Sequence, residues 1–233
     1  MKVVVLLSGG LDSSTVLAEM VNRYGNNNVF ALNMLYGQKH DKELKCALNI
    51  ANYYKVDYKV IDIAEIFKYS NSSLLKHSTK EIQNKSYDLE KKEKNLIDTY
   101  VPFRNGVMLS IASSYALSIG ASFVTYAAHK DDVCDNAYPD CGLRFYTYMN
   151  KAIEEGTDKK VKIIAPFIYS SKKDIVKKGI ELGVPFDLTW SCYKGDDKAC
   201  GVCGTCIDRL KAFKENGIKD YIEYKKEVLN EEE

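Results

Sequence analysis

A short turn near the start of the chain carries the residue types of a phosphate site. The segment Ser8–Ser13 reads Ser-Gly-Gly-Leu-Asp-Ser and lies between an apolar run and a stretch with helical spacing. Glycines let successive backbone N–H groups converge, and a helix N-terminus adds partial positive charge. Because Asp12 is unsuited to face bare phosphate, we expect it to help hold a Mg²⁺ that bridges phosphates. The alternative is an ordinary glycine turn with Asp12 as helix N-cap.

This turn differs from two familiar nucleotide-binding loops. It lacks the Lys-Ser/Thr that follows the last glycine of a Walker loop, and it is not the Gly-x-Gly-x-x-Gly of dinucleotide-binding proteins. We therefore predict an ATP site of another kind, with Mg²⁺ bound alongside the nucleotide. The predicted ATP-binding residues are Leu7, Ser8, Gly9, Gly10, Leu11, Asp12, Ser13, Ser14, Thr15, Val16, Leu17 and Ala18.

Four cysteines near the C-terminus have the spacing of a metal site. They read Cys192-x7-Cys200-x2-Cys203-x2-Cys206, with glycines that allow tight turns between them. We expect four thiolates to hold one Zn²⁺ per chain at a closed, structural site. An iron–sulfur cluster is the alternative, because Cys-x2-Cys-x2-Cys also begins ferredoxin-type runs, although the Cys-Pro that ends such runs is missing. The remaining cysteines, Cys46, Cys134 and Cys141, are expected to take no part.

The phosphate turn needs a strand and a helix to hold it, and the sequence supplies both. Residues 3–7 form a continuous apolar run typical of a parallel strand buried on both faces, and residues 13–24 carry apolar side chains at helical spacing. Strands are predicted over residues 29–35 and 58–63, with a helix over 43–54 between them. This alternation predicts right-handed βαβ units.

The same alternation continues through the second half of the chain. Helices are predicted over residues 105–119, 143–154 and 172–182, and strands over 122–127 and 161–164. The predicted fold class is therefore α/β, a doubly wound, Rossmann-like parallel sheet with a small zinc-binding module at the C-terminus.

The alternation of predicted strands and helices ends near residue 182. We predict an ATP-binding α/β domain over residues 1–182, followed by a zinc-binding module and a helical tail over residues 183–233. Residues 76–94 are polar and charge-dense without clear periodicity, which predicts a surface loop or a lid.

Polar residues that follow predicted strands are the remaining candidates for a site. Residues 36–40 follow the second strand, at the edge of the sheet where ligands of such folds bind. An arginine and an asparagine open a predicted helix and could neutralise phosphate or carboxylate. Acidic residues after another strand could accept hydrogen bonds from the N–H groups of a guanine-like ring. The alternative for all of these residues is that they are charged or polar loop residues exposed to solvent. The predicted set is Gln38, Arg104, Asn105, His129, Asp131 and Asp140, with Asp132 beside them.

Other polar residues are predicted to be structural. Cys46 lies on an apolar helix face and is expected in the core, and His77 is expected on the surface. Four lysines of the helix over residues 172–182 are expected to form a solvated face: Lys172, Lys173, Lys177 and Lys178.

Composition excludes several classes of protein. The 233 residues are 45% hydrophobic and 28% charged, which is ordinary globular usage. The formal net charge is +1, without the basic excess of a dedicated nucleic-acid binder. We therefore expect no stable nucleic-acid partner. Since no run reaches the roughly 18 apolar residues of a membrane span, we also expect no membrane partner and a cytoplasmic protein.

The turn and three later motifs resemble known families. Ser8–Ser13 resembles the PP-loop of the N-type ATP pyrophosphatases, which have an adenine nucleotide alpha-hydrolase-like fold. Together with Tyr-Val-Pro-Phe-Arg-Asn at 100–105, Tyr-Pro-Asp-Cys at 138–141 and Ser-Cys-Tyr at 191–193, it resembles the 7-cyano-7-deazaguanine synthase (QueC) family. The resemblance spans about residues 3–213, and the joint pattern is specific although each piece alone is not.

This resemblance implies a function. Its members adenylate a carboxylate and convert 7-carboxy-7-deazaguanine and ammonia, with ATP, through an amide to the nitrile preQ0, a precursor of queuosine. They are zinc-dependent and commonly dimeric, so the resemblance implies a zinc-containing homodimer. The competing interpretations are a tRNA thiolation enzyme, which needs RNA contacts, and a module that binds ATP and zinc without turnover.

Two departures concern the pocket for the deazapurine. Gly142 and Leu143 separate the Pro-Asp-Cys motif from Arg144 where many members have Arg at once, and residues 127–136 are rich in Asp and His. A related deazapurine as substrate is therefore an open alternative, whereas the ATP and zinc predictions are unaffected.

Overall fold

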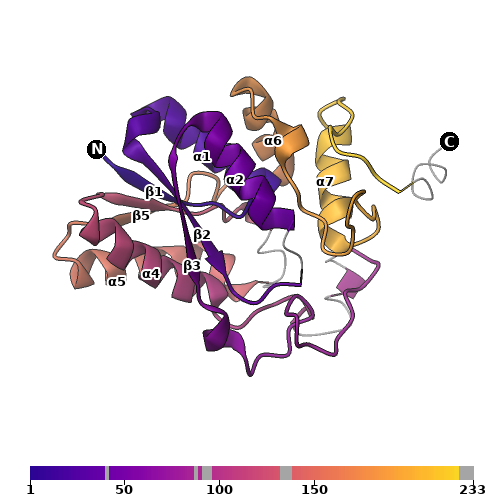
Figure 1. The fold of residues 1–233 in the computed structure, drawn as a ribbon, viewed down its shortest axis with the longest axis horizontal. Coiled ribbons are helices and arrows are strands. Elements are labelled where there is room, and N and C mark those ends of the chain that lie inside the picture. The colour runs from indigo at the N-terminus through magenta and orange to yellow at the C-terminus, as the bar shows by residue number, and fades with distance from the viewer. Residues whose placement is uncertain (40–41, 87–88, 91–95, 132–137, 226–233) are drawn as a thin grey trace.

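A five-stranded parallel sheet forms the centre of the protein, in the order β3-β2-β1-β4-β5 (Figure 1). The computed structural model describes residues 1–39, 42–86, 89–90, 96–131 and 138–225. The strands are β1 (Val3–Leu6), β2 (Val29–Leu35), β3 (Asp57–Asp62), β4 (Phe123–Thr125) and β5 (Lys162–Ile164). This confirms the predicted doubly wound α/β class.

Helices cover both faces of the sheet. Figure 1 shows α1 and α2 on one face and α4 and α5 on the other. None of the helices in the described part of the chain combines the length and apolar composition that a membrane span requires. The α-helices are α1 (Leu11–Tyr24), α2 (Lys42–Tyr54), α4 (Arg104–Ser118), α5 (Leu143–Gly156), α6 (Lys172–Glu181) and α7 (Gly204–Lys214), and the short 3-10 turns are η1 (Asn26–Asn28), η2 (Ala64–Phe67), η4 (Pro139–Cys141) and η5 (Phe186–Leu188).

The burial of β1 explains why its sequence is apolar without alternation. Val3 and Val5 pack into one hydrophobic cluster, and Val4 packs into a second cluster on the opposite face. All three side chains are fully buried. A strand with helices on both sides has no solvent face, and the run of valines follows from that.

The order of the strands fixes where a ligand binds. β1 lies between β2 and β4, so the chain leaves β1 toward one side of the sheet and returns to β4 on the other. Connections diverge at such a switch point and leave a crevice at the carboxyl ends of the strands. The phosphate turn follows β1 directly and therefore lies in this crevice.

A buried ion pair connects α7 to the residues that follow it. Arg209 of α7 donates to both carboxylate oxygens of Asp220, over 2.7 and 2.9 Å, and these side chains are 1% and 2% exposed. Arg209 also donates to Thr189 Oγ1 at 2.8 Å, and Tyr224 donates to Asp220 at 2.6 Å. Each partner satisfies the other, as a buried charge requires. The division at residue 182 stays a prediction.

The segment predicted as a loop or lid is partly outside the described residues. Directly before this segment, Leu75 forms an antiparallel bridge with Gln38, and at its first residue the amide of Lys76 donates to the carbonyl of Gly37 over 2.9 Å. Glu90 is buried and accepts a hydrogen bond from the amide of Asp98 at 2.7 Å. His77 is exposed, as predicted. A lid function remains a prediction.

Candidate active site and metal centre

A cavity of about 250 Å³ opens at the carboxyl ends of the central strands. Its floor is the end of β1 with the phosphate turn, the end of β2, and the segment that follows β4. The first residues of α4 and α6 form part of the wall, and the cysteine-containing segment closes the remaining side through Trp190, Ser191, Tyr193, Thr205 and Asp208. Segments far apart in the sequence therefore share one site.

One end of the cavity has the geometry of a phosphate site. The hydroxyl oxygens of Ser8 and Ser13 lie 3.0 Å apart, and the amide of Gly10 donates to Ser8 Oγ at 3.2 Å. Helix α1 begins after Gly10 without a side-chain cap, so its first-turn amides are available to a ligand. Two hydroxyls beside an uncapped helix N-terminus form an anion site.

The acidic residue of this turn, Asp12, is paired with a lysine that is distant in the sequence. Asp12 Oδ2 accepts from Lys172 Nζ at 2.7 Å, and His129 Nε2 lies 3.9 Å from the same oxygen. Burial opposes ionisation of Asp12, but Lys172 and His129 outweigh it and hold the pKa of this carboxyl below its usual value. Asp12 Oδ1 is buried and accepts no hydrogen bond from the described residues. A buried oxygen of this kind is suited to a metal ion.

The position of Lys172 corrects the sequence analysis. Its side chain is 17% exposed and lies in the cavity, so the prediction of a solvated face is wrong for this residue. Lys173 and Lys177 are exposed, as predicted. The signal for Lys172 was its place at the start of a helix beyond β5, at the edge of the sheet where ligands bind.

The predicted ATP-binding residues fall into two groups. Leu7, Ser8, Gly10, Asp12 and Ser13 line the cavity. The others lie behind the turn or along α1, where they are mostly buried in the core: Gly9, Leu11, Ser14, Thr15, Val16, Leu17 and Ala18.

Gly9 allows the turn to pack closely against the backbone of α2. It has φ +88°, and a Cβ there would lie 2.4 Å from the carbonyl oxygen of Glu43 and 2.5 Å from the amide nitrogen of Ala47. Its own carbonyl accepts from the amide of Trp190 at 2.9 Å. The turn is thus packed against the backbone of α2 on one side and bonded to the cysteine-containing segment on the other.

The other end of the cavity is built around Arg104. Its guanidinium carbon lies 4.9 Å from the centre of the Tyr36 ring, and Tyr138 and Tyr193 line the same region. Asn105 and Gln38 also line the cavity. Aromatic faces around a planar cation suit a flat polar ring or a carboxylate.

A strained residue directly precedes Arg104. Phe103 precedes α4 with φ +55°, in the left-handed region that side chains rarely adopt. Its ring lies against Gly106, where a Cβ would approach to 2.3 Å. Strained backbone of this kind is concentrated at ligand sites, because the surrounding packing must enforce it.

Two of the predicted acids have structural contacts instead of facing the cavity. Asp140 Oδ2 accepts from the amide of Asn105 at 2.8 Å, and Asp131 Oδ2 accepts from the amide of Lys172 at 2.7 Å. Each therefore stabilises a helix N-terminus whose first residues line the site. His129 is buried behind the cavity, with Nε2 3.4 Å from Lys172 Nζ. The predicted residues His40 and Asp132 lie outside the described residues.

Glu43 is a cavity residue that the sequence analysis did not single out. It lies in the first turn of α2 and lines the cavity between the phosphate turn and Arg104. Burial raises the pKa of Glu43 to about 7; Arg104 opposes this rise and Cys192 adds to it. Its position just beyond the loop after β2 was the only signal for it.

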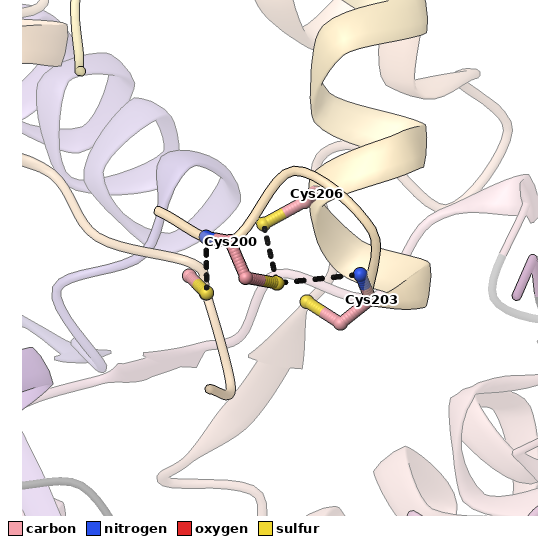
Figure 2. Close-up of side chains that lie close together, drawn as sticks. Cys200, Cys203 and Cys206 are labelled. Atoms are coloured by element: carbon pink, nitrogen blue, oxygen red, sulfur yellow. Dashed lines mark hydrogen bonds between the residues drawn. The ribbon is translucent and has the colours of Figure 1, made fainter. Parts of the chain in front are cut away.

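The four predicted cysteines converge. Figure 2 shows Cys200, Cys203 and Cys206 around the start of α7, and the sulfurs of all four lie within 4.8 Å of one another. Three backbone amides donate to Cys192 Sγ: Lys194 at 3.4 Å, Gly195 at 3.0 Å and Cys200 at 3.2 Å.

The environment of this cluster lowers the pKa of Cys192 and Cys200, whereas the neighbouring thiols, Cys192 first among them, raise the pKa of Cys203 and Cys206. The neighbouring thiols, Cys200 first among them, lower the pKa of Cys192, and the amide of Cys200 adds to this effect. Thiolate is the form that binds metal. Cys46 lies apart from the cluster, and burial raises the pKa of its thiol. The cluster is therefore able to hold a metal ion.

A lysine joins this cluster to α2. Lys42 Nζ lies 3.4 Å from the centre of the Trp190 ring and donates to the carbonyls of Asp196 and, at 2.9 Å, Asp197. The ring of Trp190 donates to the carbonyl of Cys192 at 3.0 Å. The cysteine-containing segment is thereby connected to α2, the helix that packs against the phosphate turn.

Comparison with protein families and curated proteins gives one consistent result. The model of the family described as Queuosine biosynthesis protein QueC matches residues 2–217. The chain is 41% identical over 228 residues to the 7-cyano-7-deazaguanine synthase of Caldicellulosiruptor bescii, covering 98% of this chain and 99% of that protein. It is 43% identical over 229 residues to the corresponding synthase of Thermoplasma acidophilum, covering 97% and 92%.

Solved structures share the fold at low sequence identity. The U34-tRNA thiolase NcsA from Methanococcus maripaludis with its [4Fe-4S] cluster superposes with a TM-score of 0.52 at 17% identity, covering 93% of this chain and 66% of that one. NMN synthetase from Francisella tularensis gives a TM-score of 0.52 at 13% identity, covering 94% and 78%. These likenesses establish the fold alone.

The contacts of Lys172 make a testable prediction for nucleotide binding. We expect Lys172→Ala to weaken ATP binding by roughly 10- to 150-fold, because a charge-assisted hydrogen bond contributes about 1.5 to 3 kcal/mol. The measurement is titration calorimetry with ATP and Mg²⁺. Lys173→Ala, on the exposed face of the same helix, is the matched control and should bind as the unaltered protein does. Equal affinities for the two variants would remove Lys172 from the site.

Proposed function

The chain belongs to the QueC family of queuosine biosynthesis proteins, ATP-using ligases that act on small molecules, and we propose that it converts 7-carboxy-7-deazaguanine and ammonia to 7-cyano-7-deazaguanine. The observation that supports this most is a single cavity with a phosphate site at one end and Arg104 among tyrosines at the other. A nucleotide and a flat acid can meet in such a cavity. The reacting carboxylate and phosphorus would then be held together, which removes much of the entropic barrier.

The phosphate turn is proposed to hold the pyrophosphate portion of ATP. Ser8, Ser13 and the first-turn amides of α1 would donate to phosphate oxygens, and Lys172 would neutralise charge that develops on the leaving group. Asp12 Oδ1 would hold Mg²⁺, which supplies further charge neutralisation when it is bound. ATP binding would require Lys172 to share its contact between Asp12 and phosphate.

The proposed sequence of steps needs no protein nucleophile. A carboxylate oxygen of the substrate attacks the α-phosphorus, the bond to the β-phosphate oxygen breaks, and pyrophosphate leaves. Ammonia then attacks the activated carbonyl carbon, AMP departs with the former carboxylate oxygen, and an amide results. The amide oxygen then attacks the α-phosphorus of a second ATP and pyrophosphate leaves. AMP departs with that oxygen, and loss of the two amide protons leaves the nitrile. The protein would contribute positioning and charge stabilisation.

The cysteine cluster is proposed to hold one Zn²⁺ in a structural role. A tetrahedral ion with Zn–S bonds of about 2.3 Å places its sulfurs about 3.8 Å apart, which is compatible with four sulfurs within 4.8 Å. An iron–sulfur cluster inserts its own iron and sulfide between the thiolates and needs them farther apart. A closed four-thiolate site leaves no position for substrate, so Zn²⁺ would act by holding the cavity wall.

We propose a homodimer, for which the exposed apolar residues Leu143 and Tyr148 of α5 offer a surface. A cytoplasmic location suits thiolate ligands, which need a reducing compartment. The absence of a stable nucleic-acid partner stays a prediction from the balanced charge.

The proposed reaction predicts its products. With ATP, Mg²⁺, ammonium and 7-carboxy-7-deazaguanine, we expect AMP and pyrophosphate together with a nitrile of the same ring. Mass spectrometry of the organic product and chromatography of the nucleotides measure both. ADP and phosphate as the only nucleotide products would contradict cleavage between the α- and β-phosphates.

The metal proposal predicts the effect of losing one thiolate. We expect about one Zn²⁺ per chain in the purified protein and almost none in Cys203→Ala, whose thermal unfolding should occur at lower temperature because structural zinc contributes to folding. Cys46→Ala, outside the cluster, should keep its zinc. Elemental analysis decides the question, and iron with sulfide in place of zinc would contradict the assignment of a structural zinc site.

A further inference from the structure

Glu43 is the cavity side chain whose role the phosphate and metal sites leave unexplained. It follows the loop after β2 and lies in the first turn of α2, on the wall between the two ends of the cavity. Its backbone carbonyl packs against Gly9, which fixes the position of this residue relative to the phosphate turn. The side chain lies within electrostatic reach of Arg104.

The side chain of Glu43 lines the cavity and is partly exposed, and no hydrogen bond to its carboxylate is found among the described residues. A partly buried carboxylate is most favourable when it accepts hydrogen bonds, since the cost of burying charge is compensated by pairing and hydrogen bonding. A place in the first turn of a helix favours an acid through the helix dipole, but it does not require the acid to line a cavity. A ligand that brings its own donors would satisfy this carboxylate.

The other acids near the cavity are already engaged. Asp12 is paired with Lys172, and Asp131 and Asp140 accept from the first amides of α6 and α4. Asp208 interacts with other groups of the protein. Glu43 is therefore the carboxylate best placed to recognise a substrate.

The surroundings of Glu43 suit the flat edge of a bicyclic ring. Tyr36 and Tyr193 line the cavity beside it, and the Tyr36 ring is covered by the guanidinium of Arg104. Two parallel acceptors match two adjacent N–H donors on a planar ligand, as in carboxylate recognition of an amidine-like edge. Guanine-like rings present such an edge through the ring N–H and the exocyclic amine.

We propose that Glu43 is the specificity-determining residue for the guanine-like edge, accepting hydrogen bonds from the ring N–H and the 2-amino group together. The inference rests on the proposed function, because it assigns the recognition of the substrate of that reaction. It replaces the predicted role of Asp131 and Asp140. The class of ligand is a fused bicyclic ring with adjacent ring N–H and amino groups.

The experiment compares two substrates in matched variants. Initial rates of nitrile formation are measured with 7-carboxy-7-deazaguanine and with its analogue lacking the 2-amino group, at saturating ATP and ammonium. Glu43→Gln keeps the shape but turns one acceptor into a donor. Glu65→Gln makes the same change at an exposed acid in the first turn of η2, which does not line the cavity, and serves as the control.

We expect the unaltered protein and Glu65→Gln to prefer the amino substrate in kcat/KM by at least about 100-fold, since sites built for an N–H group reject analogues that lack it. Glu43→Gln should lower kcat/KM for the amino substrate by about 10- to 100-fold and reduce the preference to a few-fold. Glu43→Asp, which retains two acceptors, should keep most of the preference. The KM for ammonium should be unchanged in Glu43→Gln.

Each contrary outcome has a distinct meaning. If the unaltered protein makes no nitrile, the proposed function fails. If it makes the nitrile without preferring the amino substrate, or if Glu43→Gln retains the preference, the role of Glu43 is overturned. A raised KM for ammonium with intact preference would also overturn it, because it would assign Glu43 to the ammonia. If Glu43→Gln does not fold, the preference of the unaltered protein and of Glu43→Asp decides the matter.

Discussion

Close backbone packing at Gly9 is the constraint on which the rest of the site depends. The residue has a positive φ and no room for a Cβ, because the backbone of α2 lies against it. Its carbonyl accepts from Trp190, two residues before the first cysteine of the metal cluster. The turn that presents Ser8, Ser13 and Asp12 is thus held between α2 and the metal segment. Its geometry is set before any ligand arrives, which is the condition for electrostatic stabilisation of a reaction.

Electrostatics divides the cavity into two ends with different chemistry. At one end Lys172 and Asp12 neutralise each other, and in the proposed function phosphate and a metal ion would compete for them. At the other, Arg104 lies over the Tyr36 ring and follows Phe103, whose φ is positive. Asp131 and Asp140, although they do not face the cavity, fix the helix starts from which Lys172 and Asn105 reach it. The protein therefore positions its charges through the first turns of its helices.

The elements with uniform burial were predictable from sequence, whereas the assignment of acids was not. The valines of β1 and the helical spacing of α1 correctly placed a turn between a strand and a helix, because a strand covered on both faces and a helix packed on one have distinctive patterns. The cysteines were predictable because their spacing alone brings them together. Asp131, Asp140 and Glu43 all follow strands, and only tertiary contacts decide which caps a helix and which faces the cavity. Lys172 was misplaced for the same reason, since helical spacing cannot distinguish solvent from a cavity at the end of a helix.

The most direct test of this account is hydrogen–deuterium exchange of the phosphate turn before and after the cysteine-bound metal is removed with a chelator. If Trp190 holds Gly9, loss of the metal should raise exchange at residues 8–13 and at Trp190 together, because the segment that fixes both is released. An increase confined to residues 192–206, with residues 8–13 unchanged, would contradict the claim that the metal segment supports the phosphate turn.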